Sequence, residues 1–129
     1  MITTVLFDLY GTLIELNHNS RPYHTLVKRL STLNTHGILR QSLVNNCSSI
    51  AEFSSLIGLP VQKDIATLEA ELMRDIDSVI LFEDSLPTLV KLKQKRIKIG
   101  LISNLAGPYR RPVKNLGLEE YFDVIVFSC

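Results

Sequence analysis

The stretch over residues 1–13 constrains the fold of this chain more than any other. Its apolar residues 5–7 end at Asp8, and Gly11 follows. A short apolar run that stops at an acid and a glycine is typical of a buried strand. Ligands of open α/β sheets bind outside the carboxyl ends of the strands, so Asp8 is predicted to face a substrate. The alternative is an ordinary turn after a strand, which Asp and Gly also favour.

Residues 17–79 have helical periodicity. A polar, turn-rich linker over 14–20 leads into them, and Ser20 is predicted to cap the first helix. The apolar stripe of that helix runs to Leu33, and Gly37 is predicted to end it. This change of pattern marks a domain junction after residue 16.

Further helices are predicted in the same region. Ser49 and Glu52 have the spacing of a capping box, and Gly58 ends the helix that they begin. From Lys63 onward, a longer amphipathic stripe runs to Val79. The middle of the chain is therefore predicted to be entirely helical.

After this region the pattern changes to alternating helices and strands. The predicted elements are a helix capped by Asp84 or Ser85, a strand over 97–102, a helix over 110–116 and a strand over 124–127. Together with the strand over 5–7, they predict an α/β core.

Ser103 and Asn104 follow directly after the strand over 97–102. A hydroxyl at a strand end can donate to an oxygen on which charge develops in phosphoryl or acyl chemistry. A Ser-Asn pair after a strand is, on its own, common turn chemistry. Asp8 and Ser103 at the ends of two neighbouring parallel strands are a more specific signal of an active site.

Charge and composition argue against several classes of protein. The 14 Lys and Arg residues nearly balance 13 Asp and Glu, with a formal net charge of +1, so no overall field favours nucleic acid or an anionic membrane. The start of the chain has no basic leader, and no apolar run reaches membrane-spanning length. Cys47 and Cys129 lack a Cys-x-x-Cys pattern. The chain is predicted to be cytoplasmic, with reduced thiols and no zinc site.

Three stretches together resemble the haloacid dehalogenase superfamily. Residues 8–12 read Asp-Leu-Tyr-Gly-Thr and resemble its first motif, Asp-x-Asp/Tyr-Gly-Thr. Residues 86–104 resemble the helix and strand that carry the second motif, and residues 116–123 resemble the stretch that leads into the third strand. The resemblance implies a hydrolase that acts on a small-molecule substrate.

The resemblance also implies a two-part architecture. Residues 1–16 and 80–129 correspond to a discontinuous Rossmann-like core, in which three strands of the usual five or more are present. Residues 17–79 stand where the family has an all-α cap of type 1.

The family's functional residues map onto the matching positions of this sequence. The resemblance implies that Asp8 is the nucleophile and forms a covalent aspartyl intermediate. Ser103 is implied to bind the transferring group or a substrate carboxylate. Thr12 and Gly11 are implied to shape the substrate-binding loop, and Asn104 is implied to face the active site.

Tyr10 departs from the phosphatases of the superfamily, which have a second Asp at this position. A phenol is a poor proton acceptor at neutral pH, so Tyr10 favours the Asp-x-Tyr-Gly-Thr form of 2-haloacid dehalogenases, which need no metal. In the phosphatase alternative, Mg²⁺ would bind the carboxylate of Asp8 and the backbone carbonyl of Tyr10. The sequence leaves open whether the substrate is phosphorylated or halogenated.

The sequence ends at Cys129, before the places where the family's third-motif lysine and fourth-motif acids occur. The resemblance places the strand over 5–7 in mid-sheet, so without the later strands it is predicted to be an open edge. Such a chain is expected to be marginally stable, aggregation-prone or a homodimer through that edge. The alternative function is that of a catalytically inactive, truncated remnant or binding module.

Substrate specificity in this architecture would come from the helical region, which has no motif. Arg21 stands near the entrance of that region and is a candidate contact for an anionic substrate. The alternative for Arg21 is a solvated position at the start of a helix.

Overall fold

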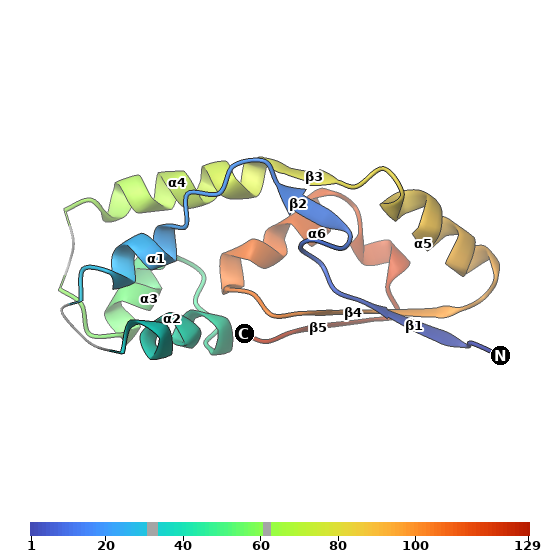
Figure 1. Ribbon diagram of the computed structural model, residues 1–129, viewed down its shortest axis with the longest axis horizontal. Helices are drawn as coiled ribbons and strands as arrows, with labels where there is room; N and C mark the ends of the chain where they lie inside the picture. The colour runs from blue at the N-terminus through green and yellow to red at the C-terminus, as the bar shows by residue number, and fades with distance from the viewer. Residues whose placement is uncertain (31–33, 61–62) are drawn as a thin grey trace.

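The structure is a computed structural model that describes residues 1–30, 34–60 and 63–129 (Figure 1). It has a mixed α/β fold with a three-stranded parallel sheet, as the sequence predicts. The sheet order is β1-β4-β5, and its strands are β1 (Thr4–Phe7), β4 (Lys98–Ser103) and β5 (Val124–Phe127).

The register of the sheet brings the three carboxyl ends to one edge. Phe7 pairs with Leu101 in β4, and Ser103 pairs with Phe127 in β5. All three strands run in the same direction, so whatever follows β1 and β4 lies at adjacent positions. The loops after β1 and β4 are therefore neighbours in space.

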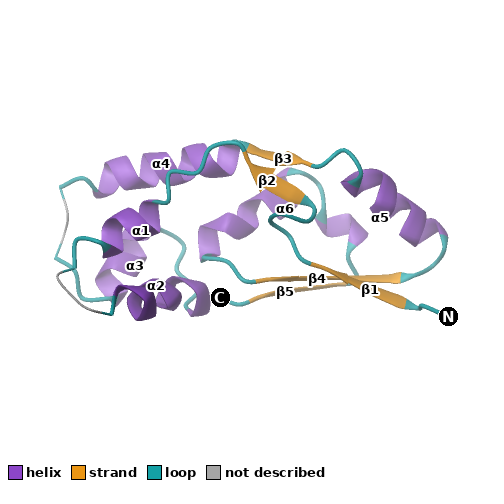
Figure 2. Cartoon of the chain, viewed as in Figure 1, coloured by secondary structure: helices purple, strands orange, loops and turns teal. Residues whose placement is uncertain are grey.

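Helices cover one face of this sheet. The predicted α/β alternation is confirmed by α5 (Ser85–Gln94) and α6 (Arg111–Asn115), which lie on the same side of the strands in Figure 2. Short 3₁₀ turns, η1 (Gly107–Arg110) and η2 (Glu119–Tyr121), flank α6. The inward-facing side chains of β4, Ile99 and Leu101, are fully buried. They pack in one hydrophobic cluster with Leu89 of α5, Val113 of α6 and Leu118.

The other face of the sheet is open and apolar. Leu6, Ile102, Val124 and Val126 are each between 49% and 59% exposed. The prediction that β1 is a buried strand is wrong: no described element covers its outward side chains, and its inward side chains are only half-buried. The prediction that it is an open edge is confirmed, since β1 pairs only with β4 in the described part of the chain.

Two short strands connect the sheet region to the helical region, and the sequence analysis did not predict them. β2 (Ile14–Leu16) and β3 (Val79–Leu81) form an antiparallel ribbon in which Leu16 pairs with Val79. Val79 was expected to belong to the preceding helix, which ends instead at Asp77. The apolar alternation of such short strands is too brief to distinguish from a helical stripe.

The region between β2 and β3 is helical, as predicted. It contains α1 (Pro22–Val27), α2 (Thr35–Val44), α3 (Ile50–Leu56) and α4 (Ile65–Asp77), which gather on the left of Figure 1. Their apolar faces form a second hydrophobic cluster, separate from that under the sheet. Its largest buried members are Tyr23, Leu26, Ile50, Phe53 and Leu72.

Local helix signals were predicted with mixed success. Ser49 caps α3 by accepting a hydrogen bond from the backbone N–H of Glu52 at 3.0 Å, as predicted. The other half of the predicted capping box differs, because the carboxylate of Glu52 accepts from the N–H and hydroxyl of Ser48 and not from Ser49. Gly37 does not end a helix, because it lies in the first turn of α2 and donates its N–H to the side chain of Asn34. Ser20 does not cap α1, since Arg21 occupies that position. Leu33 lies outside the described residues.

No helix in the described ranges has the length and apolar character needed to cross a lipid bilayer.

We expect the chain to self-associate through the open sheet face. Replacing Leu6 and Val126 together by Lys should weaken self-association at least about tenfold, because each buried Leu or Val side chain contributes about 1.5–3 kcal/mol. Ile80→Lys is the control, because Ile80 is similarly exposed but lies on β3, outside this face. Sedimentation velocity measures the effect, and a wild-type chain that stays monomeric at all concentrations contradicts it.

Candidate active site

Asp8 and Ser103 lie at the ends of adjacent parallel strands. Asp8 follows Phe7 directly, and Ser103 stands two residues beyond Leu101, the pairing partner of Phe7. The carboxylate of Asp8 is exposed, whereas Ser103 is 5% exposed. The sheet thus presents an accessible carboxylate beside a buried serine, which is the arrangement that the sequence predicts for this edge.

The loop after Asp8 is a tight turn. The backbone N–H groups of Leu13 and Ile14 donate to the carbonyl of Leu9 at 2.8 and 3.2 Å, and the N–H of Gly11 donates to the carbonyl of Ile14 at 2.8 Å. Gly11 adopts a φ of 78°, which residues with a Cβ rarely adopt. Thr12 is exposed on this turn. Gly11 therefore shapes the loop through its backbone.

The side chain of Tyr10 packs against the segment after β4. Its hydroxyl donates to the backbone carbonyl of Tyr109 at 2.7 Å, and the two rings meet edge to face with centroids 6.1 Å apart. Burial, and then the charge of Asp75, raise the pKa of Tyr10. The phenol is therefore a neutral hydrogen-bond donor that is already engaged.

Asp75 is a functional candidate that the sequence analysis missed. Its fully buried carboxylate in α4 accepts hydrogen bonds from Nδ1 of His18 at 2.7 Å and from the N–H and hydroxyl of Ser20, each at 2.9 Å. The hydroxyl of Tyr109 donates to the same carboxylate at 3.2 Å. Asp75 therefore links the linker after β2, α4 and the turn that contacts Tyr10.

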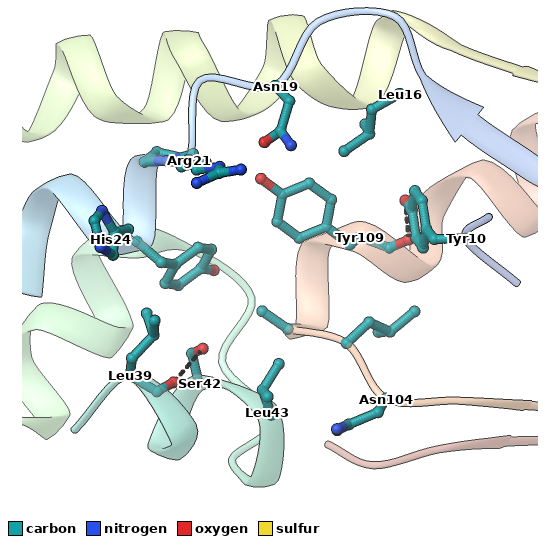
Figure 3. Close-up of a pocket in the computed structure, with 14 residues that line it drawn as sticks. Tyr10, Leu16, Asn19, Arg21, His24, Leu39, Ser42, Leu43, Asn104 and Tyr109 are labelled. Atoms are coloured by element: carbon teal, nitrogen blue, oxygen red, sulfur yellow. Dashed lines mark hydrogen bonds between the residues drawn. The ribbon is translucent and has the colours of Figure 1, made fainter. Parts of the chain in front are cut away.

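A cavity of about 470 Å³ lies between the helical region and the strand-end loops. Tyr10, Asn104 and Tyr109 line it from the sheet side, and Arg21 and His24 line it from α1 and its start (Figure 3). Asn104 thus lines a pocket. Asp8, Gly11, Thr12 and Ser103 are not part of the lining and stand at the neighbouring strand ends.

The residues predicted to hold Mg²⁺ fit a sparse site. No group of three or more His, Cys, Asp or Glu residues in the described ranges could hold a metal ion. Mg²⁺ sites are commonly built from one or two carboxylates, waters and substrate phosphates. Asp8 supplies an exposed carboxylate, and the hydrogen bonds of the turn do not use the carbonyl of Tyr10.

A parallel α/β sheet with polar residues at its carboxyl edge, next to a pocket, is the arrangement in which open α/β sheets commonly bind ligands. A family model described as haloacid dehalogenase-like hydrolase matches residues 2–129. The chain therefore belongs to the haloacid dehalogenase-like hydrolase family. No curated protein sequence matches it.

Solved structures share the fold at low sequence identity. A HAD phosphatase from Thermococcus onnurineus is 23% identical with a TM-score of 0.53, and the alignment covers 97% of this chain and 61% of that one. A HAD family enzyme from Bacteroides thetaiotaomicron, in complex with magnesium and inorganic phosphate, is 20% identical with a TM-score of 0.56 and coverages of 99% and 69%. A dehalogenase is 18% identical with a TM-score of 0.52 and coverages of 98% and 62%. The chain thus spans less than two thirds of the phosphatase and of the dehalogenase.

The network around Asp75 should be a main source of stability. Asp75→Asn replaces an acceptor by a group that cannot accept from all these donors, so the free energy of unfolding should fall by about 2–4 kcal/mol. Asp77→Asn is the matched control, because Asp77 is exposed on the same helix. Urea unfolding compares the two variants, and equal effects would show that the network carries no special stability.

Proposed function

We propose that this chain carries the nucleophile of a hydrolase that acts on a small halogenated substrate. Asp8 is the nucleophile, and Ser103 orients the substrate from the adjacent strand end. Asn104 contacts the substrate from the pocket wall, while Gly11 and Thr12 hold the loop in shape. The observation that carries this proposal is an exposed carboxylate next to a tyrosine whose hydroxyl is already engaged.

The proposed reaction needs only the carboxylate and water. An oxygen of Asp8 attacks the carbon that bears the halogen, a carbon–oxygen bond forms as the carbon–halogen bond breaks, and the halide leaves with the bonding electron pair. Water then hydrolyses the aspartyl ester. This step restores the Asp8 carboxylate and releases the hydroxylated product and a proton.

The state of Tyr10 favours halide over alcohol as the leaving group. An alkoxide must receive a proton as it leaves, whereas a halide does not. The hydroxyl of Tyr10 donates to the carbonyl of Tyr109, and burial raises its pKa, so it is poorly suited to exchange protons. Tyr10, two residues after the proposed nucleophile Asp8, thus supports a reaction that needs no acid catalysis.

Phosphate-ester hydrolysis is the second candidate. It is supported by the carbonyl of Tyr10, which the turn leaves available beside Asp8, and by the likeness to an enzyme solved with magnesium and phosphate. In this case Asp8 and the Tyr10 carbonyl would hold Mg²⁺, which supplies charge neutralisation at the phosphoryl group. Asp8 would then attack phosphorus.

We also infer that residues 17–79 act as a cap over a core formed by residues 1–16 and 80–129. The inference is supported by the two hydrophobic clusters and by the β2–β3 ribbon, through which the chain leaves the core and returns to it. The pocket lies between these two parts. A cap in this position would select substrates.

The nucleophile is tested by Asp8→Asn. Halide release from 2-chloropropionate and Mg²⁺-dependent hydrolysis of an aryl phosphate should identify the activity, and Asp8→Asn should lower it at least about 10³-fold. Asp77→Asn is the control for a general loss of charge. Activity that survives Asp8→Asn contradicts the proposal, and a wild-type chain inactive in both assays supports the non-catalytic binding module instead.

The role of residue 10 is tested by Tyr10→Asp. A carboxylate at this position supplies an acid and base, so hydrolysis of an alkyl phosphate should rise relative to halide release by about 10²-fold or more. An alkyl ester is the sharper probe because its poor leaving group depends on protonation. Kinetics with both substrates measure this ratio, and an unchanged ratio would mean that Tyr10 does not set the reaction type.

A further inference from the structure

Two free cysteines, one from the helical region and one from the sheet region, lie against the same short segment of the core. Cys47 stands in the loop between α2 and α3 and is 6% exposed. Cys129 follows β5 and is half-buried. The sequence contains no other cysteine, and neither of the two is among the residues that line the pocket. The segment that they share is residues 105–107, which follows β4.

The loop that carries Cys47 is packed tightly onto this segment. A Cβ placed on Gly107 would collide with the backbone carbonyl oxygen of Cys47, so the close approach of the two backbones requires a glycine. Ala106 belongs to the same hydrophobic cluster as Cys47. One residue further on, the carbonyl of Ser48 accepts a hydrogen bond from the guanidinium of Arg111 at 3.1 Å. Cys47 is therefore fixed to the core by its own backbone and by its neighbour's.

The end of β5 brings Cys129 to the other end of the same segment. The backbone N–H of Ser128 donates to the carbonyl of Ser103 at 3.1 Å, and its hydroxyl accepts from the N–H of Leu105 at 3.1 Å. In Figure 1 the C mark stands beside the end of α2, which the loop with Cys47 follows. Residues on either side of this core segment are thus tied to one cysteine each.

The two thiols also lie within electrostatic range of each other. Burial, then the charge of Glu52, then that of Cys129 raise the pKa of Cys47. Both thiols reach Tyr23 as well: burial and Glu69 raise the pKa of Tyr23 most, and the charges of Cys47 and Cys129 add to the effect. Because such effects decline with distance, they agree with two cysteines that stand close together across the junction of the two regions.

We propose that Cys47 and Cys129 form a reversible disulfide that ties the helical region to the sheet region. The oxidant is a small-molecule disulfide of the glutathione class. The thiolate of Cys129 attacks one sulfur of the reagent, the S–S bond of the reagent breaks, and the departing thiolate takes up a proton. The thiolate of Cys47 then attacks Sγ of Cys129 and displaces the second thiol. The two cysteines lose two electrons and two protons, and the reagent gains them as two thiols.

The order of these steps follows from the exposure of the two cysteines. Cys129 is accessible to a reagent in solution, whereas Cys47 is enclosed and meets only the mixed disulfide on Cys129. Since the pKa of Cys47 is raised, its thiolate is scarce at neutral pH, so the second step limits the rate. The finished bond would hold the loop after α2 against residues 105–107. Leu105 and Ala106 of that segment also line the pocket, so the bond would fix one wall of it.

The linkage is tested on the folded wild-type chain with oxidised glutathione. Free thiols are then blocked, and mass spectrometry is applied to the intact chain and to a tryptic digest made without reduction. The monomer should lose two hydrogens, and peptides 41–63 and 115–129 should be recovered joined. Cys47→Ser should stop at a mixed disulfide on Cys129. Cys129→Ser should remain unmodified, because Cys47 is buried.

Three results would overturn the proposal. The first is a wild-type chain that ends with glutathione on Cys129 and no joined peptides, since a disulfide needs Cα atoms within about 7 Å. The second is a bond that joins Cys129 of two chains. The third is a joined pair that forms only in urea, where the fold does not position the thiols.

Unfolding gives a second readout that a bond made outside the native fold would not produce. The oxidised wild type should unfold at a temperature about 5 °C or more above the reduced chain, because the bond closes a long loop in the unfolded state. Cys47→Ser should show no rise after the same treatment. A joined chain with an unchanged or lower unfolding temperature contradicts the proposal. Asp8→Asn should be cross-linked as the wild type is, so this result and the fate of the proposed reaction are independent.

Discussion

The buried carboxylate of Asp75 is the interaction on which the relation between the two parts of the molecule depends. A charge at 0% exposure is tolerated only where several donors surround it. Asp75 stands on α4, and its donors come from two other segments: the linker with His18 and Ser20, and the turn that carries Tyr109. The carbonyl of Tyr109 in turn accepts from Tyr10. One acid therefore fixes the linker, the helical region and the loop that follows Asp8 relative to one another.

The sequence predicts most of the fold because local periodicity and strand ends determine it. The strand at 124–127 is found where the alternation places it, and the Ser49 cap forms as its spacing requires. The missed elements are those that depend on partners distant in sequence. β2 and β3, for example, exist because they pair with each other. Local chemistry alone does not determine such pairings.

The residues of the candidate site likewise fall into those that the sequence predicts and those that it does not. Asp8 and Ser103 could be placed from the sequence, because a strand end fixes where the following side chain stands. Asp75 was missed, although an acid between Leu72 and Ile76 on the apolar side of α4 was a usable signal for a buried polar network. The sequence left two alternatives for Arg21, a contact for an anionic substrate or a solvated position at a helix start, since nothing local distinguishes a surface arginine from one beside a cavity.

The β2–β3 ribbon has a consequence for how such a chain can change during evolution. Leu16 and Val79 are paired, so the two ends of the helical segment meet. The strands on either side are therefore connected much as they would be by a short turn. The entropy of closing a loop grows only with the logarithm of its length, so insertions of different sizes cost the core nearly the same. The helices between these strands can therefore be lengthened, shortened or exchanged while the sheet that carries Asp8 keeps its geometry.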